Sequence, residues 1–374
     1  MPQNLRLLPV LIFILGLPAP VLTAGAAEGL EPIAISKDGR SFVQGTGARP
    51  FRIWGVNYDH DSTGKNGRLL EDYWKEEWGT VAQDFAEMKA LGANVVRIHL
   101  QLGKFMTGPD TANVASLSQL TRLLALAEQT GLYLNLTGLG CYHRADTPPW
   151  YDAMGEKARW SVQAKFWQAV ARTCRDSPAV FCYDLMNEPV IAGNPAEGWV
   201  TGELGGKCFV QRLTLTQGQR SAVEVAKAWT ERLTAAIRKE DPACLITVGV
   251  IPWAQVWPGA KPVFYAPEVR NFFDFVSIHL YPKKGEVDQA LAAMAVYDSG
   301  KPLVIEETFP LSCSLEEMED FLKRSKDRAE GYFSFYWGRT LAEYRAADPP
   351  EPVSTLMTGW LEYFTRKAEF MKQP

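Results

Sequence analysis

Strand-like and helix-like segments alternate along this chain from residue 51 onward, and this alternation limits its possible folds more than any other feature. Eight strands are expected, at Phe51–Asn57, Asn94–Leu100, Leu132–Thr137, Ala179–Met186, Leu245–Val250, Phe275–Leu280, Leu303–Glu306 and Tyr332–Tyr336. Helical spacing of apolar residues follows most of them, at Trp78–Leu91, Ser116–Gln129, Ala158–Arg175, Ser221–Lys239, Val287–Tyr297, Leu315–Arg328 and Thr355–Lys372. Such alternation predicts a parallel sheet, and eight units predict an α/β fold closed into a (β/α)8 TIM barrel.

The lengths of the connections favour the barrel over an open sheet. Long insertions follow strand ends, at Tyr58–Lys75, Gly138–Lys157, Pro189–Arg220, Ile251–Arg270 and Gly338–Pro352, whereas helix-to-strand connections are brief. Long loops on the C-terminal rim place a functional site there. The alternative, a doubly wound dinucleotide-binding sheet, lacks a Gly-x-Gly-x-x-Gly turn after a strand. Before the barrel, Asp38-Gly39 between two short apolar runs predicts an N-terminal β-hairpin.

The first 27 residues have the pattern of an export signal. Arg6 is their single positive charge, an apolar stretch broken by prolines follows, and small residues occupy positions 24–27. A membrane anchor needs about 20 unbroken apolar residues, which this segment does not provide. We therefore expect residues 1–27 to be a signal peptide. Residues 28–374 are expected to form one catalytic domain, secreted or periplasmic, without stable membrane insertion.

Composition narrows the class of function. The net charge is −4 and the chain has no basic tract, which argues against a nucleic-acid partner. The four histidines do not occur in a metal-binding pattern, so no metal site is predicted. Six cysteines in an exported chain permit disulfides without defining their pairing. The 12 tryptophans and 13 tyrosines suit stacking against sugar rings, although aromatic residues also cap cores.

Two glutamates are the candidate catalytic pair. Glu188 follows the fourth strand, and the proline after it favours extended geometry, so we expect Glu188 at the last rung of that strand. Glu307 closes the seventh strand. Because side chains alternate along a strand, only one of Glu306 and Glu307 is expected to face the barrel interior. Two carboxyls across one rim can divide acid and nucleophile roles in glycoside cleavage.

The motifs around these glutamates resemble glycoside hydrolase family 5 of clan A, the cellulase and mannanase family. Asn187-Glu188-Pro189 after a strand resembles the family's Asn-Glu pair, which implies that Glu188 is the acid/base and that Asn187 binds the sugar's 2-hydroxyl. Glu306-Glu307-Thr308-Phe309 resembles the Gly-Glu-Phe-Gly pattern at its second position only, which implies that Glu307 is the nucleophile.

Further matches to the family pattern imply roles for other residues. Arg97 and Tyr281 would support the nucleophile, His279 would line the site, and Trp337 would stack beneath the sugar at the cleavage point. The third strand lacks the histidine common in this family, and His143, a few residues later, is the substitute candidate. Independently of the resemblance, Asn57 at the first strand's end is a candidate for sugar binding or for starting a turn.

The implied function is a retaining β-glycoside hydrolase, endo-glucanase- or mannanase-like, that acts on an oligo- or polysaccharide or another β-glycoside without a cofactor. Two other functions use the same features: a carbohydrate-binding barrel that has lost catalysis, and a transglycosylase that uses the same residues. The departures from the family pattern at the third and seventh strands keep the first alternative open. Neither the sugar nor internal versus terminal cleavage follows from the sequence.

Overall fold

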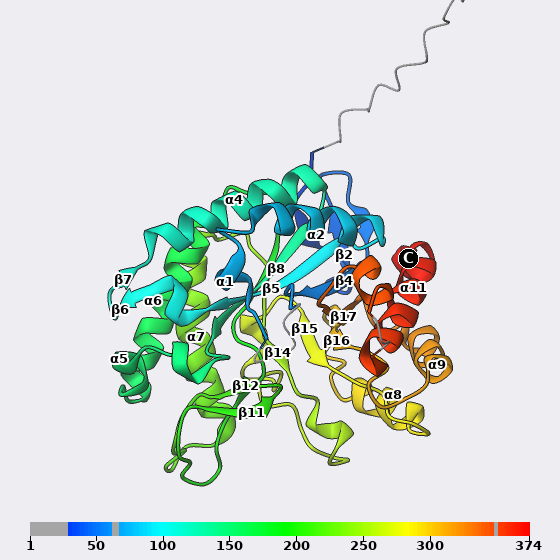
Figure 1. The fold of residues 1–374 in the computed structure, drawn as a ribbon. Helices are drawn as coiled ribbons and strands as arrows, with labels where there is room; N and C mark the ends of the chain where they lie inside the picture. Colours follow the sequence, from blue (N-terminus) through cyan, green and yellow to red (C-terminus); the bar gives the residue numbers. More distant parts are fainter. Residues whose placement is uncertain (1–28, 62–66, 348–350) are drawn as a thin grey trace, which may run out of the picture.

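A computed structural model describes residues 29–61, 67–347 and 351–374 of the chain. Eight parallel strands form a barrel surrounded by helices (Figure 1). In hydrogen-bonding order the first four are β4 (Ile53–Tyr58), β5 (Val95–Gln101), β8 (Tyr133–Gly140) and β9 (Val180–Asp184). The fifth strand is split into β13 (Ile246–Thr247) and β14 (Gly249–Val250), and β15 (Val276–His279), β16 (Leu303–Thr308) and β17 (Gly331–Trp337) follow. β13 pairs with β9 and β14 pairs with β15, so the fifth strand closes the ring. The predicted (β/α)8 barrel is confirmed.

The main surrounding helices lie where the sequence predicts them, within a few residues. They are α2 (Trp78–Ala90), α4 (Val114–Thr130), α6 (Glu156–Cys174), α7 (Ala222–Glu240), α8 (Val287–Ala295), α9 (Leu315–Ser325) and α11 (Pro352–Lys372). Capping residues mark the ends of some of these helices. Ser221 and Glu224 form a reciprocal capping box at the start of α7, and Gly131 ends α4 in the left-handed conformation with φ of 67°. Among the described residues, no helix has the length and apolarity needed to cross a membrane.

The remaining helical segments are short. They are α1 (Leu70–Tyr73), α3 (Leu102–Phe105), α5 (Pro149–Asp152) and α10 (Leu341–Arg345), together with the 3-10 turns η1 (Arg144–Asp146), η2 (Trp253–Gln255) and η3 (Arg270–Phe272). All lie in connections rather than in the ring of long helices. A two-stranded ribbon, β6 (Met106–Gly108) with β7 (Thr111–Ala112), precedes α4.

The N-terminal hairpin is confirmed and gains a third strand. β1 (Ile33–Ile35), β2 (Phe42–Gln44) and β3 (Arg49–Phe51) form an antiparallel sheet. Phe42 packs edge-on against Phe181 and Phe275, two residues from the lower ends of barrel strands. The sheet therefore closes the bottom of the barrel, and the other end of the barrel is left for the site.

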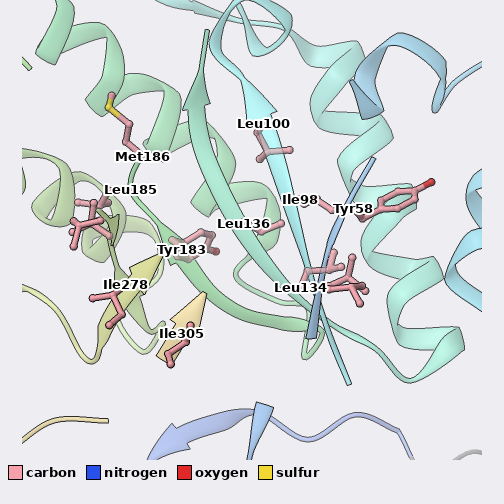
Figure 2. Packing of buried hydrophobic residues seen from close by; sticks show 14 of the residues in the cluster. Tyr58, Ile98, Leu100, Leu134, Leu136, Tyr183, Leu185, Met186, Ile278 and Ile305 are labelled. Carbon is pink, nitrogen blue, oxygen red and sulfur yellow. The ribbon is translucent and has the colours of Figure 1, made fainter. Parts of the chain in front are cut away.

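Side chains on the barrel strands divide between two faces. Ile98 and Leu100 on β5, like Leu134 and Leu136 on β8, belong to the large apolar cluster shared with the helices (Figure 2). The alternate residues on these strands are polar and buried: Arg97, His99, Asn135 and Thr137. Because the strands are parallel and in register, these polar residues meet inside the barrel near its C-terminal rim.

The rim carries the predicted insertions, one of which is more ordered than the sequence suggests. The segment between β9 and α7 forms a second small sheet from β10 (Pro189–Val190), β11 (Val200–Leu204) and β12 (Lys207–Arg212). The β11–β12 hairpin projects from the barrel in Figure 1. All six cysteines are free, so no disulfide ties these loops. The expected signal peptide, residues 1–27, lies outside the described residues.

Candidate active site

Arg97 is the centre of the polar network inside the barrel. It lies on β5 and is fully buried. All five of its N–H donors are used: Nε bonds Thr137 at 2.8 Å, Nη1 bonds Asn57 at 2.9 Å and Glu307 at 2.7 Å, and Nη2 bonds Asp184 at 2.9 Å and Asn187 at 2.8 Å. A guanidinium held by five acceptors from four strands or strand ends has one orientation. Arg97 therefore fixes the position of the carboxylate at Glu307.

Glu307 is held at both carboxylate oxygens. Oε1 accepts the hydrogen bond from Arg97, and Oε2 accepts one from the Tyr281 hydroxyl at 2.7 Å. The Glu307 side chain is 7% exposed, so only a small part of its surface is accessible to a ligand. Tyr281 follows β15, the neighbouring strand, in the order that the sequence predicts. The structure thus brings Arg97, Tyr281 and Glu307 together.

Glu188 reaches the same place by a route that differs from the expected one. β9 ends at Asp184, four residues earlier, and Glu188 has a φ of 46° rather than extended geometry. The expectation of a last-rung glutamate is therefore wrong. Its backbone N–H donates to the Gly249 carbonyl at 2.9 Å, and this bond to the split fifth strand holds the left-handed turn. As a result of this turn, the Glu188 carboxyl group points toward His279.

His279 lies between the two candidate catalytic carboxylates. Its Nδ1 is 2.9 Å from Glu188 Oε1 and 3.4 Å from Glu307 Oε1. Burial disfavours the charged imidazole, but the Glu307 charge and the carboxylates of Glu188 and Glu306 outweigh it and raise the pKa of His279 to about 10. The ring is therefore cationic at neutral pH, with its Nδ1–H toward Glu188 and Glu307 and its Nε2–H toward Glu306.

The same three residues have the donor types of a metal site. One ligand atom from each of Glu188, His279 and Glu307 falls within 4.8 Å of the other two. A protonated imidazole has no lone pair for a metal ion, and Arg97 already supplies positive charge to Glu307. The chemistry of this donor set thus fits a pair of carboxylates with a cationic partner better than it fits a resident cation.

Glu306 corrects the expectation that only one of the two neighbouring glutamates faces inward. It is fully buried inside the barrel, where Asn135 donates to Oε1 and His279 Nε2 lies 3.6 Å from Oε2. The ladders on both sides of β16 shift register, between Ile278 and His279 and between Ile305 and Thr308. A bulge interrupts strict alternation, so adjacent side chains reach the interior.

Gly249 makes this arrangement possible. A Cβ atom at position 249 would lie 2.4 Å from both Glu306 Oε2 and His279 Nε2. Gly249 also donates its N–H to Asp184 Oδ1 at 2.9 Å, in addition to accepting from Glu188. One glycine on the fifth strand therefore makes room for the Glu306–His279 contact and positions Glu188. No sequence motif points to a role for Gly249.

Sequence reasoning also missed the inner polar residues of the barrel. Asn135, Thr137 and Asp184 are fully or almost fully buried and complete the network around Arg97. Burial and the Glu306 charge raise the pKa of Asp184, and Arg97 opposes this rise. A sequence pattern could have indicated these residues, because polar residues alternate with apolar ones on β8. Asn135 on this strand lies opposite Arg97 on β5, and Thr137 lies opposite Asp184 on β9.

The two candidate asparagines, Asn187 and Asn57, are buried and form hydrogen bonds with other residues of the protein. Asn187 accepts from Arg97 and donates to the Phe209 carbonyl at 3.0 Å. Asn57 accepts from Arg97 and donates to the carbonyls of Glu306 at 3.0 Å and Ser334 at 3.2 Å. Asn57 therefore links β4, β16 and β17 beneath the site and does not start a turn.

Two other predicted residues pack against the first strand and the loop that follows it. Trp337 is fully buried against Tyr58 and His60, with ring centroids 5.6 and 5.8 Å apart, so its ring has no surface left to present to a sugar. His143 is half-buried, and its Nε2 lies 3.0 Å from the Gly67 carbonyl in the loop after β4. Phe335, two residues before Trp337, instead lines a cavity at the rim and contacts Tyr281 edge-on at 6.3 Å.

Comparison with solved structures agrees with the barrel. An exo-β-1,4-mannosidase from Opitutaceae bacterium strain TAV5 superposes with a TM-score of 0.66 at 18% identity, over 91% of this chain and 62% of that one. The β-mannanase of the blue mussel Mytilus edulis gives 0.60 at 14% identity over 91% and 97%. The β-1,4-mannanase of the sea hare Aplysia kurodai gives 0.58 at 15% identity over 82% and 92%. The present chain thus spans less than two thirds of the first of these proteins.

No curated protein sequence matches the chain. The family model for cellulase, glycosyl hydrolase family 5, matches residues 55–333, which run from β4 into β17 and include the whole polar network described above. The resemblance first seen in short motifs therefore extends over the barrel. The chain belongs to glycosyl hydrolase family 5, and it is an O-glycosyl hydrolase.

Proposed function

We propose that this enzyme is a retaining β-glycoside hydrolase that acts by double displacement, with Glu307 as nucleophile and Glu188 as general acid and base. The observation that carries the proposal is the spacing of the two carboxylates. Their oxygens lie within 4.8 Å of each other around His279. Retaining glycosidases hold their carboxyl groups about 5–5.5 Å apart, whereas inverting enzymes need about 6.5–9.5 Å to admit a water molecule.

The assignment of nucleophile follows from how each carboxylate is held. Both oxygens of Glu307 accept charge-assisted or phenolic hydrogen bonds, from Arg97 and Tyr281. A nucleophile benefits from this because its attacking oxygen must keep one line of approach to the anomeric carbon. Among the described residues, the Glu188 carboxylate has a single hydrogen-bond partner, His279, and the side chain is 15% exposed, about twice as much as that of Glu307. That environment suits a group that must exchange a proton with substrate and water.

The reaction then proceeds in two steps. An oxygen of Glu307 forms a bond to the anomeric carbon while the glycosidic C–O bond breaks and its oxygen takes a proton from Glu188. Water next attacks the anomeric carbon of the glycosyl-enzyme, gives a proton to Glu188 and releases Glu307. Arg97 and the cationic His279 offset the negative charge of the clustered carboxylates throughout, so no cofactor is required.

The proposed substrate is a β-linked oligo- or polysaccharide. The solved structures with similar folds include enzymes described as β-mannanases and an exo-β-1,4-mannosidase, and the matching family model is that of cellulases. β-Linked mannose and glucose are therefore the first sugars to test. We also propose export, with residues 1–27 as the signal, so the amino terminus of the mature protein should lie near residue 28.

The substitution Glu188→Ala tests the proton-transfer role. We expect its hydrolysis of unactivated oligosaccharides to be lost. 2,4-Dinitrophenyl glycosides, whose leaving group needs no acid, should still form the glycosyl-enzyme, and added azide should speed turnover and yield a glycosyl azide. Product analysis by mass spectrometry distinguishes these results.

The matched control is Glu197→Ala, an exposed glutamate in the same inserted segment. It should keep wild-type activity on both substrate types and show no azide effect. If Glu188→Ala cleaves activated and unactivated substrates with equal losses, and azide changes neither rate nor product, then Glu188 is not the acid.

A further inference from the structure

Two cavities are lined by residues that follow the barrel strands. The first, about 200 Å³, is lined by Pro189 and Val250, the residues that directly follow Glu188 and its backbone partner Gly249. The second, about 180 Å³, is lined by Asn57 and Phe335. Asn57 shares Arg97 Nη1 with Glu307, and Phe335 contacts the Tyr281 ring whose hydroxyl bonds Glu307. The second cavity is therefore linked to the nucleophile through Asn57 and Phe335. Val250 belongs to the same strand as Gly249, whose Cβ position faces Glu306 and His279, so Val250 and the first cavity lie on the other face of that strand.

The two glutamates separate the two halves of a substrate. The leaving oxygen takes its proton from Glu188, so the departing group lies on the Glu188 side of the pair. The sugar that becomes bonded to Glu307 lies on the other side, toward the second cavity. We call the second cavity the glycone pocket. A volume of about 180 Å³ is below the roughly 300–1,000 Å³ of pockets for drug-sized ligands, and has room for one sugar ring rather than a chain.

The β11–β12 hairpin lines one side of the glycone pocket. Leu204 and Gly205 at the hairpin's tip line the pocket together with Lys207 at the start of β12. The turn has two residues, Gly205 and Gly206, with φ of 57° and 79°, and Leu204 pairs with Lys207 across it. Positive φ at both turn residues is the geometry of a tight hairpin. The wall of the pocket is thus a regular, short β-turn.

Three hydrogen bonds anchor this hairpin. Lys207 Nζ donates to the Arg68 carbonyl at 3.3 Å, and the Cys208 N–H donates to the Tyr142 carbonyl at 2.8 Å. Further along β12, Gln211 Nε2 donates to the Leu139 carbonyl at 2.7 Å. These bonds join the hairpin to the loop after β4 and to the end of β8. The hairpin consequently forms a fixed wall over the site.

The pocket also contains a polar group without a partner in the protein. His99 lies on β5 two residues beyond Arg97, is 6% exposed, and its Nε2 has no hydrogen-bond partner among the described residues. Burial and the nearby Arg97 charge lower the pKa of His99, so this imidazole is neutral. A buried nitrogen left unpaired at a cavity wall is costly unless a ligand pairs with it. A sugar hydroxyl is such a ligand.

We propose that the glycone pocket holds one terminal sugar, so that this hydrolase removes single residues from the non-reducing ends of β-linked saccharides. The inference rests on the proposed retaining function and adds the mode of cleavage to it. The pocket has room for one sugar ring, and Leu204 and Gly205 of the hairpin line its side. His99 hydrogen-bonds a hydroxyl of the terminal sugar.

The test uses 4-nitrophenyl β-glycosides of glucose and mannose, each as the single sugar and as the β-1,4-linked disaccharide. We expect nitrophenol from the single-sugar compound. From the disaccharide compound of the same sugar, the first products should be a monosaccharide and the nitrophenyl single-sugar glycoside. Release of free disaccharide with nitrophenol, at a higher kcat/KM than for the single-sugar compound, would overturn the terminal-cleavage mode while supporting the hydrolase. Cleavage of none of the four compounds would count against the proposed function itself.

A shortened hairpin tests the wall. Deleting Leu204 and Lys207 together leaves Gly205-Gly206 as a two-residue turn between Glu203 and Cys208, which are already paired. We expect this variant to release disaccharide from the disaccharide compounds, and an unchanged product pattern would contradict the role of the hairpin. Glu203→Ala, an exposed position of β11 that does not line the pocket, keeps the hairpin's length and is the matched control; it should still release only monosaccharide first.

His99→Ala provides a second readout that does not depend on remodelling the hairpin. We expect its KM for the single-sugar compound to rise about tenfold, the loss of roughly one hydrogen bond, with a smaller change in kcat. An unchanged KM would show that His99 does not contact the terminal sugar.

Discussion

Arg97 Nη1 lies 2.7 Å from Glu307 Oε1 in a fully buried setting, and this ion pair is also the centre of the barrel's polar interior. The same guanidinium pairs with Asp184 at 2.9 Å and lies 3.8 Å from Glu306. Removing the guanidinium would leave the buried carboxylates of Asp184, Glu306 and Glu307 without this positive charge. The residue that orients the proposed nucleophile is therefore also needed for folding stability.

For Arg97→Met we predict a loss of about 3–5 kcal/mol in the free energy of unfolding, the usual cost of breaking a buried ion pair by removing one partner. Urea unfolding followed by tryptophan fluorescence measures it. Arg172→Met is the control, because its pair with Glu240 leaves Arg172 63% exposed, and exposed ion pairs contribute little to stability. Equal losses in the two variants would contradict the structural role of Arg97.

The stability of the protein should fall at alkaline pH because of His279. Its pKa rises from an ordinary value of 6.5 to about 10 in the folded protein, so the charged ring stabilises the folded state fully below pH 6.5. This contribution is lost as the pH rises from 6.5 through about 10. We expect the free energy of unfolding to decline over that window in the wild type, and the decline to be smaller in His279→Gln. Parallel curves for the two proteins would contradict the assignment.

Glu306 should influence the pH dependence of activity through the same ring. The Glu306 carboxylate lies 3.6 Å from His279 Nε2, and replacing it with Gln removes a negative charge that helps keep the ring protonated. For Glu306→Gln we therefore predict that the alkaline limb of the kcat/KM profile moves to lower pH. A purely structural role would reduce activity equally at every pH, and that result would argue against the electrostatic role.

Gly249 gives a steric prediction. A methyl group at this position would meet Glu306 and His279 at 2.4 Å, so Gly249→Ala must displace the ring or the strand and should cost about 1–3 kcal/mol, as overpacking usually does. Activity should fall with it, because Gly249 also holds the Glu188 backbone. Gly79→Ala is the control: a Cβ at Gly79, in α2, meets nothing within 4 Å, so stability should not fall. Wild-type stability and activity in Gly249→Ala would show that the site tolerates the clash.

Most of the barrel could be predicted because its signals are local. Apolar runs near Ile53, Val95 and Leu303 identify strands, and Gly131 and Ser221 identify helix ends without tertiary information. Arg97 and Glu307 were placed correctly for a similar reason: each stands on a strand whose end lies at the rim.

The remaining features depend on contacts between distant segments. The bulges beside β16 turn both Glu306 and Glu307 inward, and they arise from pairing with β15 and β17 rather than from the sequence of β16. The positive φ of Glu188 is held by Gly249, about sixty positions later in the chain. The burial of Trp337 likewise follows from packing against Tyr58 and His60 on the first strand and its loop. A pattern within one segment carries no information on such contacts.

The most direct test of the account is to trap the glycosyl-enzyme. 2-Deoxy-2-fluoro β-glycosides of glucose and mannose with good leaving groups slow breakdown of the intermediate, so it can be found by peptide mass spectrometry. The account predicts one sugar adduct, on Glu307, and its disappearance in Glu307→Gln. An adduct on Glu306 or Glu188, or turnover of these compounds by Glu307→Gln at the wild-type rate, would contradict it.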